Sequence, residues 1–369
     1  ININNEDDMK KLYFLGIVSV VCIFFGSCND EWKEELHSQM ISFKAPVGSN
    51  GVCDIYMRYQ PDGTASYELP VIVSGTRDNE RNIDVKIGVD NDTLYHLNTE
   101  KFAVGRKDLW YRQLPENFYS FPSEICQIPA GENVQNYTLN FNLKGLDLNE
   151  KWVLPLNVEE DPSYVRNIRK GWCKALLGIN LYNDYSGTYS TTLMNIYVDG
   201  TTNDPAIVDN RVTRVVDNNS IFFYAGSVWE EDENRSKYKV IVTFNEGELN
   251  KDGNMAGSLT IKQGDPTSGA NIVPVGDCTY ELIVQKHETK PYLERHITIL
   301  RLEYKYTDFT SDPKNPMIYD VKGSMTMERQ INTLIPDQDQ AIQWMQQPIS
   351  LLLLLQLKIL LLINKKDIL

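Results

Sequence analysis

The feature that most constrains the fold of this chain is an alternation of apolar and polar residues with period two. It recurs in short segments through most of the sequence and is clearest at 83–89 (IDVKIGV) and 238–244 (YKVIVTF). Alternation of this kind buries one face of a β-strand and exposes the other. Turn signals such as 61–63 (PDG) and 129–131 (PAG) separate the segments. The pattern predicts an all-β protein built from short antiparallel strands.

The strand pattern falls into two groups on either side of 183–187 (NDYSG), and 369 residues are enough for two domains. Residues 36–182 predict an Ig-like antiparallel β-sandwich, with one short helix at 92–102. Residues 183–344 carry about eight consecutive strands, including a hairpin around Lys290 and Pro291, and predict an up-and-down barrel without free sheet edges. Its first and last segments, SGTYS and GSMTMER, resemble those of calycin or lipocalin-like barrels. A second sandwich is the structural alternative.

The segment 9–35 (MKKLYFLGIVSVVCIFFGSCNDEWKEE) has the organisation of a secretory signal. Two lysines open it, an apolar run follows at 12–25, and small residues precede Cys28. The sequence around Cys28 resembles a bacterial lipobox, which implies cleavage before Cys28 and attachment of lipid to it. A transmembrane helix is the alternative, but about 20 apolar residues are needed to span a bilayer. Residues 1–27 are thus expected to be a signal peptide with an upstream extension before Met9.

The acidic run that follows Cys28, at 28–35, resembles the surface-export signal of Bacteroidota lipoproteins; a solvated charged linker is the alternative. We therefore expect a lipid-anchored protein of the outer membrane, exposed at the cell surface.

The Leu-rich tail at 345–369 carries Gln356 and Lys358 in its apolar part. A central lysine costs about 2.5–3.5 kcal/mol on membrane insertion. We expect this tail to lie outside the fold, with a terminal interaction helix as the alternative.

The charge and metal-ligand content exclude several functions. With 50 acidic and 36 basic residues, the net charge of -14 argues against nucleic acids and anionic membrane surfaces as partners. Four histidines show no metal-binding spacing, and the acidic turns 90–92 and 250–254 complete no calcium loop. We therefore expect no cofactor and no metal. Outside the signal, the cysteines form no CxxC pair and are expected to be mostly small buried residues, although their disulfide state cannot be deduced from spacing: Cys53, Cys126, Cys173 and Cys278.

Four segments carry a resemblance to a known family: 31–52 (EWKEELHSQMISFKAPVGSNGV), 67–75 (YELPVIVSG), 150–164 (EKWVLPLNVEEDPSY) and 183–190 (NDYSGTYS). They resemble a family of Bacteroidota surface lipoproteins, over about residues 31–344. Its N-terminal domain of unknown function also precedes a chitinase-like endo-N-acetylglucosaminidase, and a second uncharacterised β-domain follows. Members are typically encoded in polysaccharide-utilisation loci. The resemblance implies a polysaccharide or oligosaccharide ligand and SusC-type or SusD-type outer-membrane partners, and it identifies no catalytic residue.

Aromatic loops are the features best suited to bind sugars, because flat rings pack against the apolar faces of sugar rings. One such loop carries Trp110, Tyr111, Arg112 and Tyr119, with Arg112 as a hydrogen-bond donor. Another leads to Trp229 and the acidic run 230–233. These five residues are the predicted glycan-binding residues. The alternative is that they pack between the two domains.

The leading hypothesis is a non-catalytic glycan-binding accessory of a polysaccharide-uptake system. A glycoside hydrolase is the second hypothesis, and it needs two carboxylates facing each other across the scissile bond. The acidic runs 159–161 and 230–233, and Asp337 with Asp339, lie in polar, loop-like sequence where solvated charge is the simpler interpretation. No nucleophile elbow, Walker loop or dinucleotide motif is present. A structural or protein-interaction module on the outer membrane is the third hypothesis.

Overall fold

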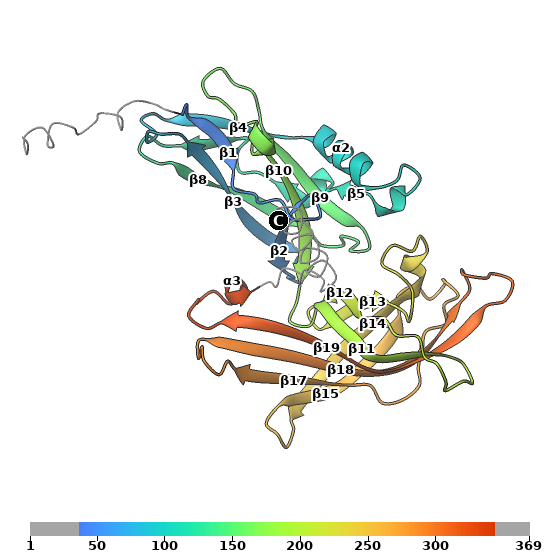
Figure 1. The fold of residues 1–369 in the computed structure, drawn as a ribbon. Coiled ribbons are helices and arrows are strands. Elements are labelled where there is room, and N and C mark those ends of the chain that lie inside the picture. The colour runs from blue at the N-terminus through green and yellow to red at the C-terminus, as the bar shows by residue number, and fades with distance from the viewer. Residues whose placement is uncertain (1–36, 344–369) are drawn as a thin grey trace, which may run out of the picture.

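The computed structural model describes residues 37–343, which form two β-rich units joined by the segment 183–186 (Figure 1). Strands dominate both units, so the predicted all-β fold class is confirmed. The predictions for Cys28, for the acidic run and for the Leu-rich tail concern residues outside the described range. Within 37–343, no helix has the length and apolar composition needed to cross a membrane.

Two facing sheets form the first unit, a β-sandwich. One sheet has the strand order β1 (Met40–Phe43), β3 (Thr64–Ser74), β8 (Val134–Asn142) and β6 (Tyr119–Ser120). The other has the order β2 (Cys53–Arg58), β10 (Lys174–Tyr182), β9 (Lys151–Val158), β4 (Ile83–Val89) and β7 (Ile125–Ile128), with β5 (Tyr111–Gln113) beside β9. The apolar positions of the period-two pattern meet between the sheets, where Leu69, Leu139 and Leu156 are fully buried.

Two strand pairs of the sandwich depart from the predicted antiparallel arrangement. Strand β2 runs parallel to β10, and β5 runs parallel to β9. Parallel neighbours need a long connection, and both pairs join strands that lie far apart in the sequence. A local pattern of strands and turns predicts hairpins between consecutive strands, so it does not detect such pairs.

Helix α2 (Asn91–Lys101) confirms the helix predicted at 92–102. Its first turn is capped by the carboxylate of Asp90, which accepts a hydrogen bond from the backbone N–H of Thr93 at 3.0 Å. Leu94 of the helix packs with Val153 and Leu176 on the outer face of the second sheet. Strand β9 is therefore buried on both faces, which explains its nearly continuous apolar run. Short 3₁₀ turns lie at Lys107–Leu109, Glu116–Phe118, Arg169–Gly171 and Arg235–Tyr238.

The second unit is a closed up-and-down barrel. Its eight strands are β11 (Gly187–Val198), β12 (Asn210–Asp217), β13 (Ser220–Tyr224), β14 (Lys239–Leu249), β15 (Met255–Gln263), β17 (Thr279–Lys286), β18 (Leu293–Asp308) and β19 (Met317–Asn332). Each strand pairs antiparallel with the next, and β19 pairs with β11, which closes the barrel as predicted. Two short strands outside the ring of eight pair with barrel strands: β16 (Val273–Pro274) lies beside β18, and β20 (Ile342–Gln343) lies beside β19.

Large side chains fill the middle of the barrel, where Tyr189, Phe223 and Tyr304 are almost completely buried. The closing contact between β11 and β19 depends on Gly323, which has a φ of 140°. A Cβ atom at this position would lie 2.0 Å from the carbonyl oxygen of Leu193. Only glycine therefore lets the two strands approach closely enough to close the sheet.

Three strands are longer than the rest of the barrel requires. Strands β18 and β19 pair along their whole length, up to Leu293 opposite Asn332. Strand β17 follows them to Lys286, whereas the pairing of β11 with β19 stops at Ser190 opposite Thr326. The ends of β17, β18 and β19 thus extend beyond the closed part of the barrel, toward the junction with the sandwich and toward helix α3 (Gln338–Ala341) (Figure 1).

Candidate functional site at the open end of the barrel

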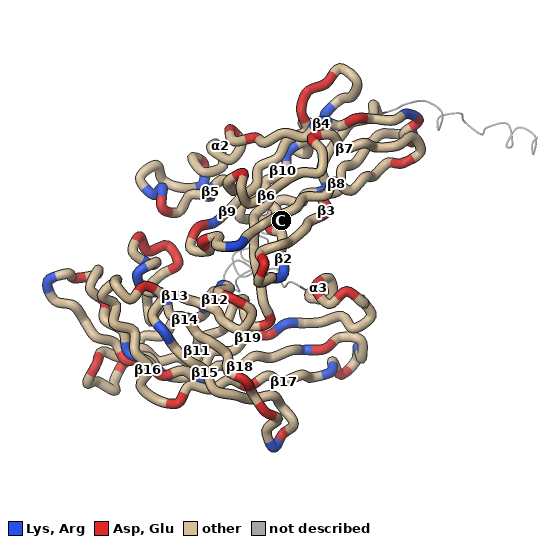
Figure 2. Tube along the Cα trace, turned by 180° about the vertical axis from the view of Figure 1, so that it is seen from behind, with Lys and Arg blue, Asp and Glu red and all other residues tan. Residues whose placement is uncertain are grey.

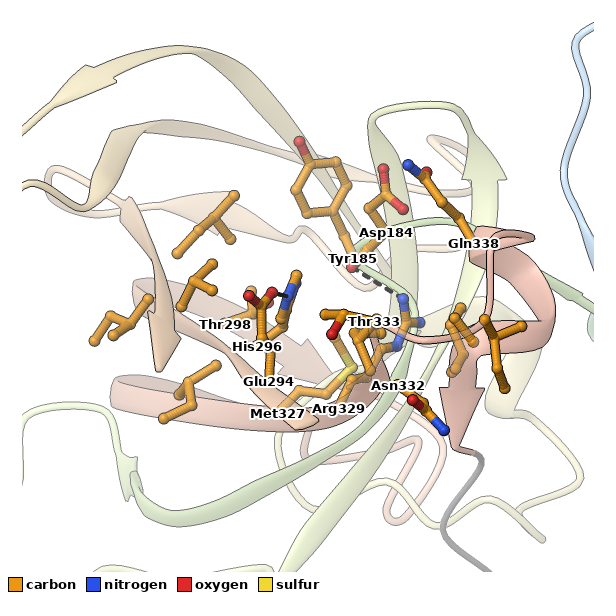
Figure 3. Close-up of a pocket in the computed structure, with 18 of the residues that line it drawn as sticks. Asp184, Tyr185, Glu294, His296, Thr298, Met327, Arg329, Asn332, Thr333 and Gln338 are labelled. Carbon is orange, nitrogen blue, oxygen red and sulfur yellow. Dashed lines mark hydrogen bonds and ion pairs between the residues drawn. The ribbon is translucent and has the colours of Figure 1, made fainter. Parts of the chain in front are cut away.

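A cavity of about 620 Å³ lies where the three long strands extend past the barrel (Figure 3). Its volume is within the range of small-molecule sites, roughly 300–1,000 Å³, and barrel mouths and domain junctions are common places for them. Its walls come from β17, β18, β19, the 183–186 junction, the segment between β19 and α3, and Arg58 of the sandwich. Its polar residues are Arg58, Asp184, Tyr185, Glu294, His296, Thr298, Arg329, Asn332, Thr333 and Gln338.

The register of the three strands places these side chains in rows across one face. Leu282, Thr298 and Met327 are neighbours in one row, and Val284, His296 and Arg329 are neighbours in the next. Positions two apart on a strand share a face, so these rows continue the inward face of the barrel. Deeper positions of β18 on this face are apolar, including Leu300 and Leu302. The inward face therefore changes from apolar to polar at the mouth.

One wall of the cavity carries a polar pair from β18. The Nε2 atom of His296 lies 3.2 Å from the Oε2 atom of Glu294, and both side chains are half-buried. Figure 3 shows Glu294, His296 and Thr298 of β18 grouped together, and Arg329 of the adjacent strand β19 is the register partner of His296. A hydroxyl-bearing ligand can thus find both hydrogen-bond donors and acceptors at short range.

Arg329 connects the cavity wall to the junction between the two units. Its guanidinium donates hydrogen bonds to the carbonyl oxygens of Asn183 at 2.9 Å, Asp184 at 3.2 Å and Ser186. Burial lowers the pKa of Arg329 below its ordinary value. The three carbonyl groups fix its side chain, so it forms a rigid part of the wall.

The remainder of the cavity surface is apolar. It includes Leu282, Val284, Ile331, Ile335 and Ile342. The ring of Tyr185 also borders the cavity and stacks on Phe244, with 3.8 Å between the ring centroids. A cavity with apolar surface, one fixed aromatic ring and several hydrogen-bonding side chains suits a ligand that is polar at its edges and apolar on its faces.

Arg58 brings the sandwich into the site. Its Nη1 atom donates to Asp184 at 2.8 Å and its Nε atom donates to Asp339 at 2.6 Å. Burial by itself lowers the pKa of Arg58, but the hydrogen bonds with Asp184 and Asp339 outweigh it and raise this pKa above its usual value. The cavity is therefore completed by both units.

None of the five predicted glycan-binding residues lines this cavity. Tyr111 is only 8% exposed beneath α2, and its hydroxyl donates to the carbonyl oxygen of Asn50 at 3.0 Å. Burial raises the pKa of Tyr111 to about 12. Its ring offers no open face, because the helix covers the sheet at this point. Tyr111 is a core residue in the structure.

The other predicted residues of the first loop also make contacts within the sandwich. Trp110 is half-buried and meets Tyr95 edge to face, with ring centroids 5.9 Å apart. Arg112 donates through Nε to Glu150 at 3.1 Å. Tyr119 is half-buried and packs on Phe121, with centroids 5.3 Å apart. The loop thus forms no continuous aromatic surface.

Trp229 is different, because 73% of it is exposed. The backbone that carries it is fixed from inside the barrel by Arg211, whose Nη1 donates to the carbonyl oxygen of Val228 at 2.6 Å. On its other side, Arg214 donates to Glu230 at 2.6 Å. An exposed indole on a fixed backbone retains the properties expected of a sugar-stacking residue.

The tertiary structure brings the two predicted loops together. Arg106 donates to the carbonyl oxygen of Glu231, and Arg235 donates through Nη2 to the carbonyl oxygen of Asp108 at 2.9 Å. These contacts join the loop after α2 to the loop after Trp229. These contacts are made by charged side chains and backbone carbonyl groups, and the Trp229 ring itself is mostly exposed.

The acidic residues considered for hydrolysis are engaged in local contacts. Asp337 caps α3 by accepting from the N–H of Asp339 at 2.9 Å, and Asp339 itself binds Arg58. Glu230 binds Arg214, and Asp161 binds Lys86 at 2.9 Å. In the part of the chain that the structure describes, no three histidine, cysteine or acidic side chains group closely enough to hold a metal ion.

The residues that line the cavity were not predicted from the sequence, although the pattern of polar residues in β18 indicated them. In β18, the polar residues Glu294, His296 and Thr298 occupy the same alternate positions as the buried Leu300 and Leu302. A row of polar residues on the inward face of a barrel strand marks either an open end or a filled polar interior. Which of these applies depends on the neighbouring strands.

Comparisons with known proteins cover both units. The N-terminal part matches a family described as a domain of unknown function, DUF4973, over residues 32–162. A second family model, which describes a C-terminal domain, matches residues 173–326. No protein with a curated function matches the chain. The first match confirms one part of the resemblance, namely that the N-terminal part of the chain is a domain of unknown function.

Solved structures from Bacteroides match over most of the chain. A multidomain protein of Bacteroides ovatus that includes DUF1735 is 42% identical, with 83% of this chain and 100% of that chain covered and a TM-score of 0.74. A protein of unknown function from the same species is 32% identical, with coverages of 84% and 97% and a TM-score of 0.72. An auxiliary nutrient binding protein of Bacteroides thetaiotaomicron is 33% identical, with coverages of 82% and 100% and a TM-score of 0.70.

The shared sequence runs through the sandwich and the barrel and spans nearly the whole length of each solved structure. These structures are described as multidomain, as of unknown function or as nutrient binding. The chain therefore belongs to the family of two-unit β-proteins that these Bacteroides structures represent.

Proposed function

We propose that the protein is a non-catalytic accessory that binds a saccharide nutrient in the cavity at the open end of its barrel. The observation that carries the proposal is the composition of this cavity. Apolar side chains from β17 and β19 share it with the polar pair Glu294 and His296 and with the ring of Tyr185. Sugars present apolar ring faces and hydroxyl edges, and both find partners here.

The relative described as an auxiliary nutrient binding protein supports the same class of function, because it shares 33% of its residues and both units with this chain. The cavity also favours binding over hydrolysis. Its lining contains two carboxylates, Asp184 and Glu294, and that of Asp184 is held by Arg58 at 2.8 Å. A glycosidase needs one carboxylic acid and a second carboxylate acting together on the bond.

The proposal includes a place for the protein. The signal-like segment and Cys28 support a lipoprotein anchored to the outer membrane and exposed at the cell surface, beside SusC-type and SusD-type proteins. Metabolic labelling with a radioactive fatty acid tests this directly. The full chain should take up label, and a Cys28→Ser variant should take up none. Equal labelling of both proteins would contradict the anchor.

Affinity electrophoresis of the full chain, through gels that contain starch, a β-glucan, a mannan or mucin glycans, tests the binding function. Val284→Trp should fill the cavity and abolish retardation, since Val284 lines it and is 57% exposed. Glu294→Gln should weaken retardation by removing an anionic acceptor. The matched control is Glu288→Gln, an exposed glutamate of the β17–β18 turn that does not line the cavity.

Retardation by one glycan that is lost in Val284→Trp and retained in Glu288→Gln would support the cavity as the site. Retardation that survives in Val284→Trp and disappears in Trp229→Ala would move the site to the exposed indole. Migration unaffected by every glycan would contradict saccharide binding.

A further inference from the structure

The loop between β9 and β10 exposes apolar side chains that the sandwich does not need for its core. Within this tip loop, residues 162–173, Ile168 is 70% exposed, Val165 is 53% exposed and Trp172 is 49% exposed. Single exposed apolar residues are ordinary, but three within eight positions of one loop, including a tryptophan, are characteristic of an interaction surface. The cavity and the Trp229 loop make no use of them.

The backbone of the tip loop is held firmly by strand β1, so the outward orientation of these side chains is built into the fold. The N–H of Ile41 donates to the carbonyl oxygen of Val165 at 2.8 Å, and the N–H of Asn167 donates to that of Ile41 at 2.7 Å. The N–H of Phe43 donates to the carbonyl oxygen of Trp172 at 2.9 Å. Other residues of the loop turn inward, and Tyr164, Asn167 and Cys173 are buried.

The β9–β10 loop begins with three acidic residues, Glu159, Glu160 and Asp161, and only its distal part, the tip loop 162–173, is basic. Residues 162–173 contain Arg166, Arg169 and Lys170 and no acidic residue, in a chain with 50 acidic and 36 basic residues. Arg166 is paired with Glu160. Within residues 37–343, Arg169 and Lys170 form no ion pair, so two positive charges stand beside the exposed apolar side chains.

We propose that the tip loop docks on a lipid bilayer with anionic head groups. Tryptophan prefers the level of the head groups, and aliphatic side chains beside it enter the acyl boundary. Each nearby lysine or arginine adds attraction to an anionic surface. The net charge of -14 argues against an anionic surface for the protein as a whole, but charges more than about 8 Å away are largely screened at physiological ionic strength. Of the nearby acidic residues, Glu160 is paired with Arg166 and Asp161 with Lys86.

The position of the loop fits this role. Figures 1 and 2 place it at the end of the sandwich that is remote from the barrel. His37 precedes Ile41 by four residues, so it lies within about 14 Å of the strand that holds the loop. If Cys28 carries lipid as proposed above, the nine-residue step from Cys28 to His37 spans at most about 32 Å when fully extended. The anchor and the tip loop would then meet one membrane, and the barrel would face away from it.

Site-specific fluorescence tests the docking. The full chain is reconstituted into vesicles with an environment-sensitive dye at Ile168→Cys, and the matched control carries the dye at Val104→Cys. Val104 is 72% exposed, and its loop contacts the barrel through Arg106. The cysteines of the described residues are all buried, which favours selective labelling of the new thiol.

In vesicles of three parts phosphatidylcholine to one part phosphatidylglycerol, the dye at position 168 should show blue-shifted emission and protection from iodide. The dye at position 104 should show neither. Arg169→Glu combined with Lys170→Glu should reverse the shift at position 168. In phosphatidylcholine alone the shift should be smaller, and added salt should reduce it.

Equal signals at positions 168 and 104 would overturn the proposal. A shift at position 168 that requires added outer-membrane proteins would also overturn it, and would assign the loop to a protein partner. Affinity electrophoresis of the same preparation reports on saccharide binding, so failure of docking and failure of the proposed function remain distinguishable.

Discussion

The Nε atom of Arg58 donates a hydrogen bond to the carboxylate of Asp339 at 2.6 Å, which joins strand β2 of the sandwich to helix α3 beside the barrel. The same guanidinium binds Asp184 of the junction. The three residues connect the two units at the edge of the cavity. Domain arrangement and the shape of the candidate site therefore depend on one another.

Replacing Arg58 should affect both stability and binding. In Arg58→Met the apolar stem remains and the charged hydrogen bonds to Asp184 and Asp339 are lost, so the free energy of unfolding should fall by about 1–2 kcal/mol. Binding of a retarding glycan should weaken as well. Urea denaturation and affinity electrophoresis provide the measurements. The control is Arg301→Met, which removes a half-exposed arginine from Glu281 away from the cavity. The Glu281 carboxylate keeps its hydrogen bonds from Asn250 and Asn254, so stability should change by less than about 0.5 kcal/mol.

The buried Arg211 should determine the order of the loop that carries Trp229. Arg211→Met removes the donors of the Gly226 and Val228 carbonyl groups and should lower the free energy of unfolding by about 2–3 kcal/mol. Loss of these contacts should also free the loop, which the fluorescence anisotropy of Trp229 would report in a protein whose other tryptophans are replaced by phenylalanine. Unchanged anisotropy in a folded Arg211→Met protein would show that the loop is ordered by other contacts.

The sequence predicts both Trp229 and Tyr111 as glycan-binding residues. Because Trp229 is exposed and Tyr111 is buried, replacing each by alanine should affect stability differently. Trp229→Ala should change stability by about 0.5 kcal/mol or less, since the indole is mostly exposed. If the indole stacks on sugar, this variant should weaken glycan retention about tenfold.

Tyr111→Ala should instead destabilise the sandwich by about 3–5 kcal/mol, because it empties part of the core beneath α2. Thermal unfolding and affinity electrophoresis of the two variants separate the roles. A stable Tyr111→Ala protein that has lost glycan binding would restore Tyr111 to the predicted site.

The thiol of Cys126 should make stability depend on alkaline pH. Burial raises the pKa of Cys126 to about 11, against 9.0 for a free thiol. The folded state therefore favours the protonated thiol, and its contribution is fully present below pH 9 and lost as the pH rises to about 11. A difference of about two in pKa corresponds to about 2–3 kcal/mol.

Urea unfolding of the wild type and of Cys126→Ala between pH 8 and pH 11 checks this prediction. The stability lost between these values should be larger in the wild type, since alanine does not titrate. In addition, the native protein should react slowly at Cys126 with iodoacetamide at pH 8, because the thiolate is the reacting species. Parallel pH profiles for the two proteins would refute the assignment.

The sequence predicted the barrel more completely than the sandwich. Each barrel strand pairs with the next in the chain, so the hairpin signals between strands carry most of the topology. In the sandwich, the pairing of β2 with β10 joins the beginning of the unit to its end. No local signal encodes such a contact, and the antiparallel expectation missed it.

The prediction of the site was limited for a related reason. Loop aromatics such as Tyr111 and Trp229 look alike in sequence, because both stand next to polar residues. Tyr111 is buried only because α2 folds over β9, and Trp229 is exposed because the loop after β13 turns outward. Burial is a property of packing between distant segments, and periodicity along one segment does not report it.

By itself, the sequence determined the all-β class, the two groups of strands and the position of α2, since each follows from periodicity and turn chemistry within a few residues. The cavity was decided by the tertiary structure alone. Its walls join Arg58, the 183–186 junction and the ends of three strands, which become neighbours only when the barrel closes and meets the sandwich. Closure and register are set by pairings between distant parts of the chain, and these fix which polar side chains face one another.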